Sequence, residues 1–166
     1  MRSPTWGKQS LKPLDLINTA RDLIRTKPGK PSQANLKRAV STAYYAVFHC
    51  LARTCADLLI GSAGAARNAG AWQHVYRALE HGTAKNACVN QAVIGRFPIA
   101  VQNFAAVFVA LQEKRHSADY DPAAQYYKSA VRQDIDDAHA AITAFEAAPA
   151  QDKRAFAALV LFKGRR

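Results

Sequence analysis

The feature that most constrains the fold is a long stripe of apolar residues in the first half of the chain. Between residues 32 and 60 they recur at every third or fourth position, which places them on one face of an α-helix. Ser32 suits the N-cap of this helix, and the glycines at 61 and 64 suit its C-terminal end. The stripe consists of Leu36, Val40, Ala43, Val47, Leu51, Cys55 and Leu58. It predicts one long helix that buries this face against other helices.

Shorter stripes with the same period occur in the rest of the chain. They predict further helices over residues 10–26, 71–81, 98–120, 123–147 and 151–162. Pro98 is expected within the first turn of its helix, where proline is tolerated, and residues 83–90 are expected to add only a turn. The pattern fits no strand-built enzyme fold. It predicts an all-α fold, a four- to five-helix up-and-down bundle with mostly antiparallel neighbours.

The length and composition are those of one domain with two charged ends. With 166 residues, 49% of them hydrophobic, the chain can bury a substantial core. We divide it into a basic N-terminal leader at 1–9, the helical bundle at 10–148 and a basic C-terminal tail helix at 149–166. This division is based on where the predicted helices and the excess of positive charge fall.

The formal net charge of +11 is concentrated at the two ends of the chain. Residues 1–38 carry nine Lys or Arg and two Asp, residues 149–166 carry five and one, and the segment between them is neutral. Basic ends suit a polyanion such as nucleic acid, bound through phosphate contacts that salt would weaken. They equally suit a solubilising surface that binds no ligand.

The sequence also indicates a compartment. No apolar run approaches the ~20 residues needed to cross a bilayer, and residues 1–12 lack the apolar segment of a secretory signal. We interpret Cys50, Cys55 and Cys88 as small buried residues in a reducing environment, because none has a Cys or His partner at zinc-binding spacing. The prediction is a soluble, cytoplasmic protein without a membrane segment.

No metal or cofactor motif is present in the sequence. There is no glycine-rich phosphate loop and no Ser/His/Asp arrangement with supporting context. The acidic residues of the last long helix are expected to follow a solvated face: Asp134, Asp136 and Asp137. We therefore predict neither a metal site nor a cofactor.

Three polar residues share one face of the long helix. Arg38, Tyr45 and His49 are separated by seven and four positions, so they lie on the face that points away from Val40 and Val47. This face either forms an exposed ladder of polar side chains or packs against a cleft or a second subunit. All three residues are candidates for contacts with a ligand or RNA.

A further candidate, Arg115, continues an apolar stripe that ends at Leu111. A guanidinium in that position needs a partner, because a buried unpaired charge is costly. We expect Asp119, across the corner that ends this helix, to form a bidentate pair with it and Tyr120 to cover it. The arrangement is either a clamp that fixes the turn or the cationic floor of a pocket for phosphate or a nucleotide.

Two motifs together carry a family resemblance. The long helix contains RAVSTAYYAVFH at residues 38–49, and the later corner contains RHSADYDP at residues 115–122. In this order, and within a helical bundle, they resemble the HEPN domain superfamily, in particular its small stand-alone bacterial members with an R-x-x-A-D-Y-D corner. The resemblance covers about residues 10–148. It implies an RNA-associated, homodimeric protein of a bacterial defence or toxin–antitoxin-type system.

The resemblance also bears on catalysis. Many HEPN ribonucleases carry an arginine followed by a histidine at a short spacing; the arginine stabilises the phosphorane charge and the histidine moves a proton. In this chain Tyr120 stands where that histidine is expected, and His116 is adjacent to Arg115. Metal-independent RNA cleavage is therefore not favoured. If the chain does cut RNA, we expect Arg115 and His49 to carry the reaction, with Arg38 as a phosphate contact.

Other assignments remain compatible with these residues. Arg67 with His74 and Arg132 with His139 have a similar spacing, but at positions other than the expected corner. A non-catalytic module could bind a partner protein, since other members of the superfamily pair with a nucleotidyltransferase. A nucleotide or phosphate sensor could use Arg115.

Overall fold

The computed structural model describes residues 11–25, 28–63 and 67–164. The predicted basic leader at residues 1–9 therefore lies outside the described residues. The described part forms helices only, so the predicted all-α class is confirmed. The helices are α1 (Pro13–Ile24), α2 (Gln33–Ile60), α3 (Ala69–Ala78), α4 (His81–Val89), α5 (Gln91–Ile94), α6 (Ile99–Tyr120), α7 (Lys128–Ala147) and α8 (Ala150–Leu161).

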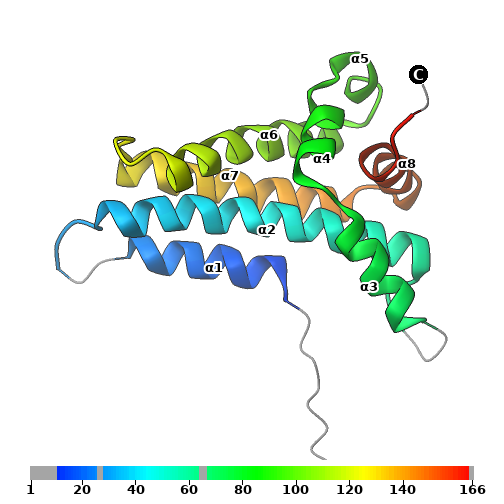
Figure 1. The fold of residues 1–166 in the computed structure, drawn as a ribbon, viewed down its shortest axis with the longest axis horizontal. Helices are drawn as coiled ribbons and strands as arrows, with labels where there is room; N and C mark the ends of the chain where they lie inside the picture. The colour runs from blue at the N-terminus through cyan, green and yellow to red at the C-terminus, as the bar shows by residue number, and fades with distance from the viewer. Residues whose placement is uncertain (1–10, 26–27, 64–66, 165–166) are drawn as a thin grey trace, which may run out of the picture.

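Four of these helices form the centre of the molecule. Helices α1, α2, α6 and α7 lie side by side and run in alternating directions, as an up-and-down bundle does (Figure 1). Helix α2 packs against each of the other three, and α7 packs against α1 and α6. The groove between α2 and α6 and the groove between α1 and α7 therefore lie on opposite sides of the bundle.

Aromatic residues fill the core at one end of the bundle. The rings of Phe104 and Phe145 stack with their centroids 4.1 Å apart, and Phe156 meets both edge-on. All three side chains are fully buried. Because Phe156 belongs to α8, this helix is part of the same core. The tail helix expected at residues 149–166 is present as α8, and its Phe156 packs into the core of the bundle.

The ends of α2 follow the sequence prediction. The Ser32 hydroxyl accepts a hydrogen bond from the Asn35 amide at 3.1 Å, and Gly61 closes the helix with φ of +118°. Glycine adopts that backbone angle without the steric penalty that a side chain would bring. Pro98 differs slightly, because it is the N-cap of α6 and not a residue of the first turn.

Two connections differ from the prediction. Where a turn was expected at residues 83–90, the chain forms α4, whose buried residues Ala84 and Cys88 are too small to give a strong apolar stripe. Helix α7 begins at Lys128 and not at residue 123. Side-chain bonds hold the preceding segment in a loop: Asp121 accepts from the Ala123 amide at 2.9 Å, and Gln33 bonds both backbone groups of Tyr126.

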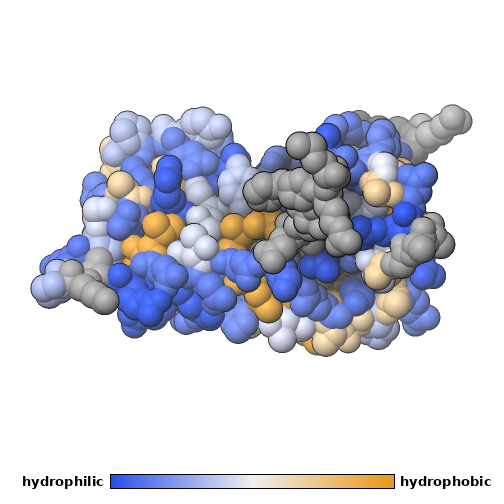
Figure 2. Space-filling view, turned by 90° about the horizontal axis from the view of Figure 1, so that it is seen from below, coloured by the Kyte–Doolittle hydropathy of each residue, from blue (hydrophilic) through white to orange (hydrophobic). Residues whose placement is uncertain are grey.

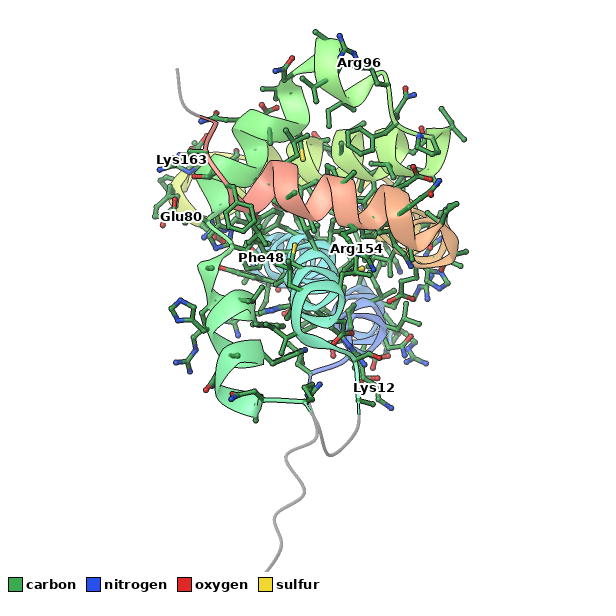
Figure 3. The ribbon with its side chains drawn as sticks, turned by 90° about the vertical axis from the view of Figure 1, so that its right-hand side faces the viewer. Lys12, Phe48, Glu80, Arg96, Arg154 and Lys163 are labelled. Atoms are coloured by element: carbon green, nitrogen blue, oxygen red, sulfur yellow. The ribbon has the colours of Figure 1, made fainter. Side chains whose placement is uncertain are left out.

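The view along the bundle shows how its end is arranged (Figure 3). Phe48 points into the interior, Arg96 lies at the outer edge of the view beside α5, and Arg154 is an exposed residue of α8. Lys163, just after α8, is 3.9 Å from Glu80, which precedes α4. Among the helices of the described residues, none combines the length and the hydropathy that a bilayer-spanning segment requires.

Candidate functional site

Arg115 lies near the C-terminal end of α6, and its side chain is 18% exposed. Its Nε atom is 2.9 Å from Asp119 Oδ2, so the expected ion pair is present. The pair is not bidentate as expected, because the Nε–H makes no hydrogen bond within the described residues. The expected location of Asp119 across a corner is wrong, because α6 continues to Tyr120 and the pair spans one turn of the same helix. Asp119 also accepts a hydrogen bond of 2.6 Å from Ser41 of α2.

Two tyrosines of α2 surround the Arg115 guanidinium. Its Nη2 is 3.2 Å from the Tyr45 hydroxyl, and its Cζ is 5.7 Å and 5.5 Å from the ring centroids of Tyr44 and Tyr45. These distances are within the range of cation–π contacts. Burial opposes the charge, but Tyr45 and Asp119 outweigh it, so the pKa of Arg115 is raised above its ordinary value. The side chain therefore stays charged in a half-enclosed site.

Tyr120 does not cover Arg115 as expected. It is 68% exposed, and its ring contacts that of His116 at a centroid distance of 4.9 Å. The reason is its position on the helix: Arg115 and Asp119 face α2, whereas Tyr120 is one residue further round and faces outward. Tyr45 takes the covering role instead.

His49 is held by aromatic residues on both sides. Its Nδ1 is 2.6 Å from the Tyr76 hydroxyl of α3, and its ring stacks between Tyr45 and Tyr76 at centroid distances of 6.1 Å and 5.8 Å. Burial lowers the pKa of His49 below its ordinary value. The imidazole is therefore mainly neutral at pH 7.

His81, the first residue of α4, belongs to the same region and was missed by the sequence analysis. Its Nδ1 is 2.5 Å from the Tyr44 hydroxyl, and its ring stacks on Phe48 at 4.0 Å. Burial, and then the positive charge of Arg115, lower the pKa of His81. No apolar pattern marks this histidine, because its position depends on the break between α3 and α4.

Together these side chains form what we call the Arg115 cluster: Arg115, Tyr44, Tyr45, His49, Tyr76 and His81. Arg115 and His49 each contact Tyr45. Within the described residues no hydrogen bond joins Arg115 directly to either histidine. The cluster is therefore one connected network built from α2, α3, α4 and α6, with Tyr45 as the shared contact.

Arg38 is not part of this network. Its residue is exposed, although it shares the helical face of Tyr45 and His49. Farther along that face, Tyr45 and His49 are partly covered by α6 and α3. Of the three residues on this face, Arg38 is therefore exposed, and Tyr45 and His49 are half-buried.

One side of Arg115 reaches a surface cavity of about 380 Å³, the Arg115 cavity, which is lined by Lys85, Gln112, Glu113, Arg115 and His116. Lys85 and Glu113 form an ion pair of 3.0 Å at its edge. The side-chain amide of Gln112 donates to the His81 carbonyl at 3.3 Å, while its Oε1 is buried without a partner among the described residues. The lining of the cavity thus contains two cations, Arg115 and Lys85, and one carboxylate, Glu113.

The acidic residues of α7 and the three cysteines were also singled out in the sequence. The expectation of a solvated face is wrong for Asp134, which is 7% exposed and pairs with Lys114 at 2.5 Å. Cys50, Cys55 and Cys88 are buried, as expected, and burial raises the pKa of each thiol to about 12. In the part of the chain that the structure describes, no group of three or more His, Cys, Asp or Glu is placed to hold a metal ion.

The two other Arg–His spacings do not join the cluster. Arg67 lies over the Trp72 ring at 4.9 Å and donates to the Ser62 carbonyl, and His74 is exposed. His139 of α7 is 3.2 Å from Arg21 of α1, on the opposite side of the bundle.

Comparisons with models of protein families, with curated proteins and with solved structures find no match to this chain.

Proposed function

We propose that this chain is a HEPN-like, RNA-associated protein of a bacterial defence or toxin–antitoxin-type system, and that Arg115 contacts a phosphate of the RNA. The observation that carries this proposal is the Arg115 cavity, where an oriented, charged guanidinium lies at the surface with Lys85 and His116. A guanidinium fixed by its neighbours loses little side-chain entropy when it binds a phosphate.

The sequence motifs and the charge distribution support RNA as the source of that phosphate. The two motifs of the resemblance contribute Tyr45 and His49 on one side and Arg115 and Asp119 on the other, and these residues belong to one packed region. The excess of positive charge at the chain ends adds long-range attraction for a polyanion. The resemblance further implies a homodimer, which is part of the proposal.

Binding is better supported than cleavage. Of the cluster, only Arg115 lines the Arg115 cavity, whereas the Nδ1 atoms of His49 and His81 are each occupied by a tyrosine hydroxyl. The side chain at position 120, where the resemblance calls for a histidine, is an exposed tyrosine. A phosphate held at Arg115 therefore meets no histidine of the expected motif.

Metal-independent RNA cleavage is the second candidate function. It is favoured by one observation: two half-buried imidazoles, His49 and His81, have lowered pKa values and lie in the same cluster as Arg115. A neutral imidazole can accept a proton from an attacking hydroxyl, and an arginine can stabilise charge on phosphorus. If the cluster cuts RNA, the proton is transferred by the Nε2 atom of His49 or His81, because each Nδ1 is bonded to a tyrosine hydroxyl.

Fluorescence anisotropy with labelled single-stranded RNA at several salt concentrations tests the binding proposal. We expect Arg115→Gln to weaken binding by about tenfold or more, because a charge-assisted hydrogen bond contributes about 1.5–3 kcal/mol. The slope of log affinity against log salt should fall by about 0.7, the value for one phosphate contact on a single strand. The exposed Arg96→Gln, at the far end of the molecule, is the matched control and should bind like the wild type.

Because Arg115 is partly buried, a second variant keeps this test decisive. His116→Gln changes an exposed residue of the same cavity, so it should fold normally and still weaken binding. Unchanged RNA affinity in both Arg115→Gln and His116→Gln would overturn the proposal. Affinity for free nucleotides alone, lost in Arg115→Gln, would instead identify a nucleotide sensor.

A cleavage assay in the presence of EDTA separates the second candidate from the first. Loss of activity in His49→Ala, His81→Ala and Arg115→Ala is expected if the cluster cuts RNA. Equal cleavage by the wild type and all three variants would refute this assignment, and the absence of cleavage by the wild type would leave a binding function only.

A further inference from the structure

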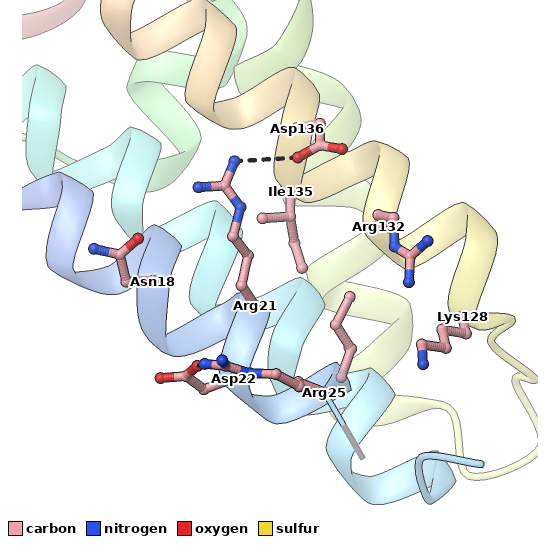
Figure 4. A pocket seen from close by; sticks show the side chains of 9 residues that line it. Asn18, Arg21, Asp22, Arg25, Lys128, Arg132, Ile135 and Asp136 are labelled. Atoms are coloured by element: carbon pink, nitrogen blue, oxygen red, sulfur yellow. Dashed lines mark hydrogen bonds and ion pairs between the residues drawn. The ribbon is translucent and has the colours of Figure 1, made fainter. Parts of the chain in front are cut away.

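On the opposite side of the bundle, α1 and α7 border a cleft of about 580 Å³. We call it the α1–α7 cleft, and Figure 4 shows its lining side chains. Four of them are cationic and two are carboxylates, a formal excess of two positive charges. The charged residues are Arg21 and Asp22 of α1, Arg25 just after it, and Lys128, Arg132 and Asp136 of α7. The face on the α1 side is mostly hydrophilic, with hydrophobic patches between the polar residues (Figure 2).

The charges of the cleft are not all neutralised by one another. Arg21 reaches across to α7, where it is 3.1 Å from Asp136 and 3.2 Å from His139. Arg25, just after α1, pairs with Asp22. Both carboxylates are therefore engaged. Lys128 and Arg132 have no hydrogen bond or ion pair within the described residues, and both project from α7 at the cleft (Figure 4). These two cations are available to an anion.

The same end of α7 also offers an exposed aromatic ring. Lys128 lines a second cavity of about 520 Å³, so the two hollows adjoin there, and Tyr126 and Tyr127 line the second one. Tyr126 is fixed, because its hydroxyl donates to the Lys114 carbonyl at 2.9 Å and its backbone bonds to Gln33. Tyr127 is 72% exposed and makes no hydrogen bond through its hydroxyl in the described part of the chain.

We propose that this groove binds a nucleotide unit, with its phosphate on Lys128 and Arg132 and its base stacked on Tyr127. A cationic cleft beside an exposed aromatic ring is the combination that single-stranded nucleic acids and nucleotides use, since phosphate and base are recognised by different side chains. The groove also lies at the N-terminal end of a 20-residue helix, whose dipole favours negative charge. The two engaged carboxylates leave the net charge of the cleft positive.

This site is separate from the one in the proposed function. Arg115 and its partners lie between α2 and α6, whereas Lys128 and Arg132 face α1. The nucleotide unit is either free or part of a single strand, and the experiment distinguishes these sources. Measurements are made in the Arg115→Gln background, so that binding at the first site is weakened and the two proposals can fail separately.

The experiment compares three ligands by calorimetry or anisotropy: inorganic triphosphate, ATP and a short single-stranded oligouridylate. We expect the double variant Lys128→Gln/Arg132→Gln to lower the affinity for each ligand that the wild-type groove binds, by about tenfold or more. Tyr127→Ala should weaken ATP or the oligonucleotide and leave triphosphate unchanged, and Tyr127→Phe should restore the affinity. The double variant Arg96→Gln/Arg154→Gln, at two exposed arginines outside the groove, is the control of equal charge change.

Each outcome decides the question. Binding of ATP shows that a free nucleotide is sufficient, whereas binding of the oligonucleotide alone assigns the groove to a single strand. Binding of neither ligand overturns the proposal. Affinities that stay the same in Lys128→Gln/Arg132→Gln, or that fall equally in Arg96→Gln/Arg154→Gln, also overturn it, because the cations of the cleft would then have no specific role.

Discussion

The two sides of the bundle hold their arginines in different ways. Between α2 and α6, Arg115 is 18% exposed, is enclosed by Tyr44 and Tyr45, and pairs with Asp119. Between α1 and α7, Arg132 is exposed and has no partner within the described residues. Arg115 stabilises the fold through its partners, and only its accessible part can contact a ligand. Arg132, in contrast, contributes little to folding and is available to a ligand.

The largest expected effect is on stability. Arg115→Ala should lower the free energy of unfolding by about 1–3 kcal/mol, because Tyr45 and Asp119 lose a partner in a partly buried site. Arg132→Ala should change it by no more than about 0.5 kcal/mol, as is usual for exposed residues. Urea unfolding followed by circular dichroism measures both. Equal losses of unfolding free energy in the two variants would contradict the different roles assigned to Arg115 and Arg132.

The histidines of the Arg115 cluster predict a dependence of stability on pH. Burial lowers the pKa values of His49 and His81 from 6.5, so protons bind better to the unfolded chain. Their contribution to stability is therefore complete above pH 6.5 and is lost as the pH falls through the lower, folded-state pKa values. Urea unfolding between pH 5 and 8 should show this loss.

A double variant serves as the reference for this pH effect. His49→Gln/His81→Gln should flatten the pH dependence between 5 and 6.5, relative to the wild type. A profile that keeps the wild-type slope in the double variant would show that other groups cause it, and the description of a neutral, half-buried cluster would then be wrong.

The smallest expected effect concerns two neighbouring tyrosines. Tyr126→Phe should cost about 0.5–1.5 kcal/mol, because it removes the hydrogen bond to the Lys114 carbonyl. Tyr127→Phe should be neutral, since that hydroxyl has no partner in the described part of the structure. Thermal unfolding of the two variants, measured side by side, is sufficient. A cost for Tyr127→Phe equal to that for Tyr126→Phe would mean that the Tyr127 ring is not free to stack with a base.

The long helix and its ends could be predicted from the sequence because their signals are local. The apolar stripe of α2, the Ser32 cap and Gly61 depend on residues a few positions apart, and the structure confirms all three. Helix α4 could not be predicted in the same way. Its buried side chains, Ala84 and Cys88, are small, so they leave no clear periodic pattern.

The part of the site that depends on local spacing could also be predicted from the sequence. The pairing of Arg115 with Asp119 follows from a spacing of four residues and the cost of a buried charge. The covering role of Tyr45 depends on how α2 is rotated relative to α6, and the presence of His81 depends on where the chain turns between α3 and α4. Both are properties of tertiary packing, which neighbouring residues in the sequence do not determine.

The most direct test of the account is to locate RNA on the protein. Single-stranded RNA containing 4-thiouridine is crosslinked to the full chain by light, and the modified peptides are identified by mass spectrometry. Contact between RNA and Arg115 predicts crosslinks in the exposed residues beside it, His116 and Tyr120, and their loss in Arg115→Gln. Crosslinking elsewhere on the chain, with none in residues 112–120, would contradict the proposed phosphate contact.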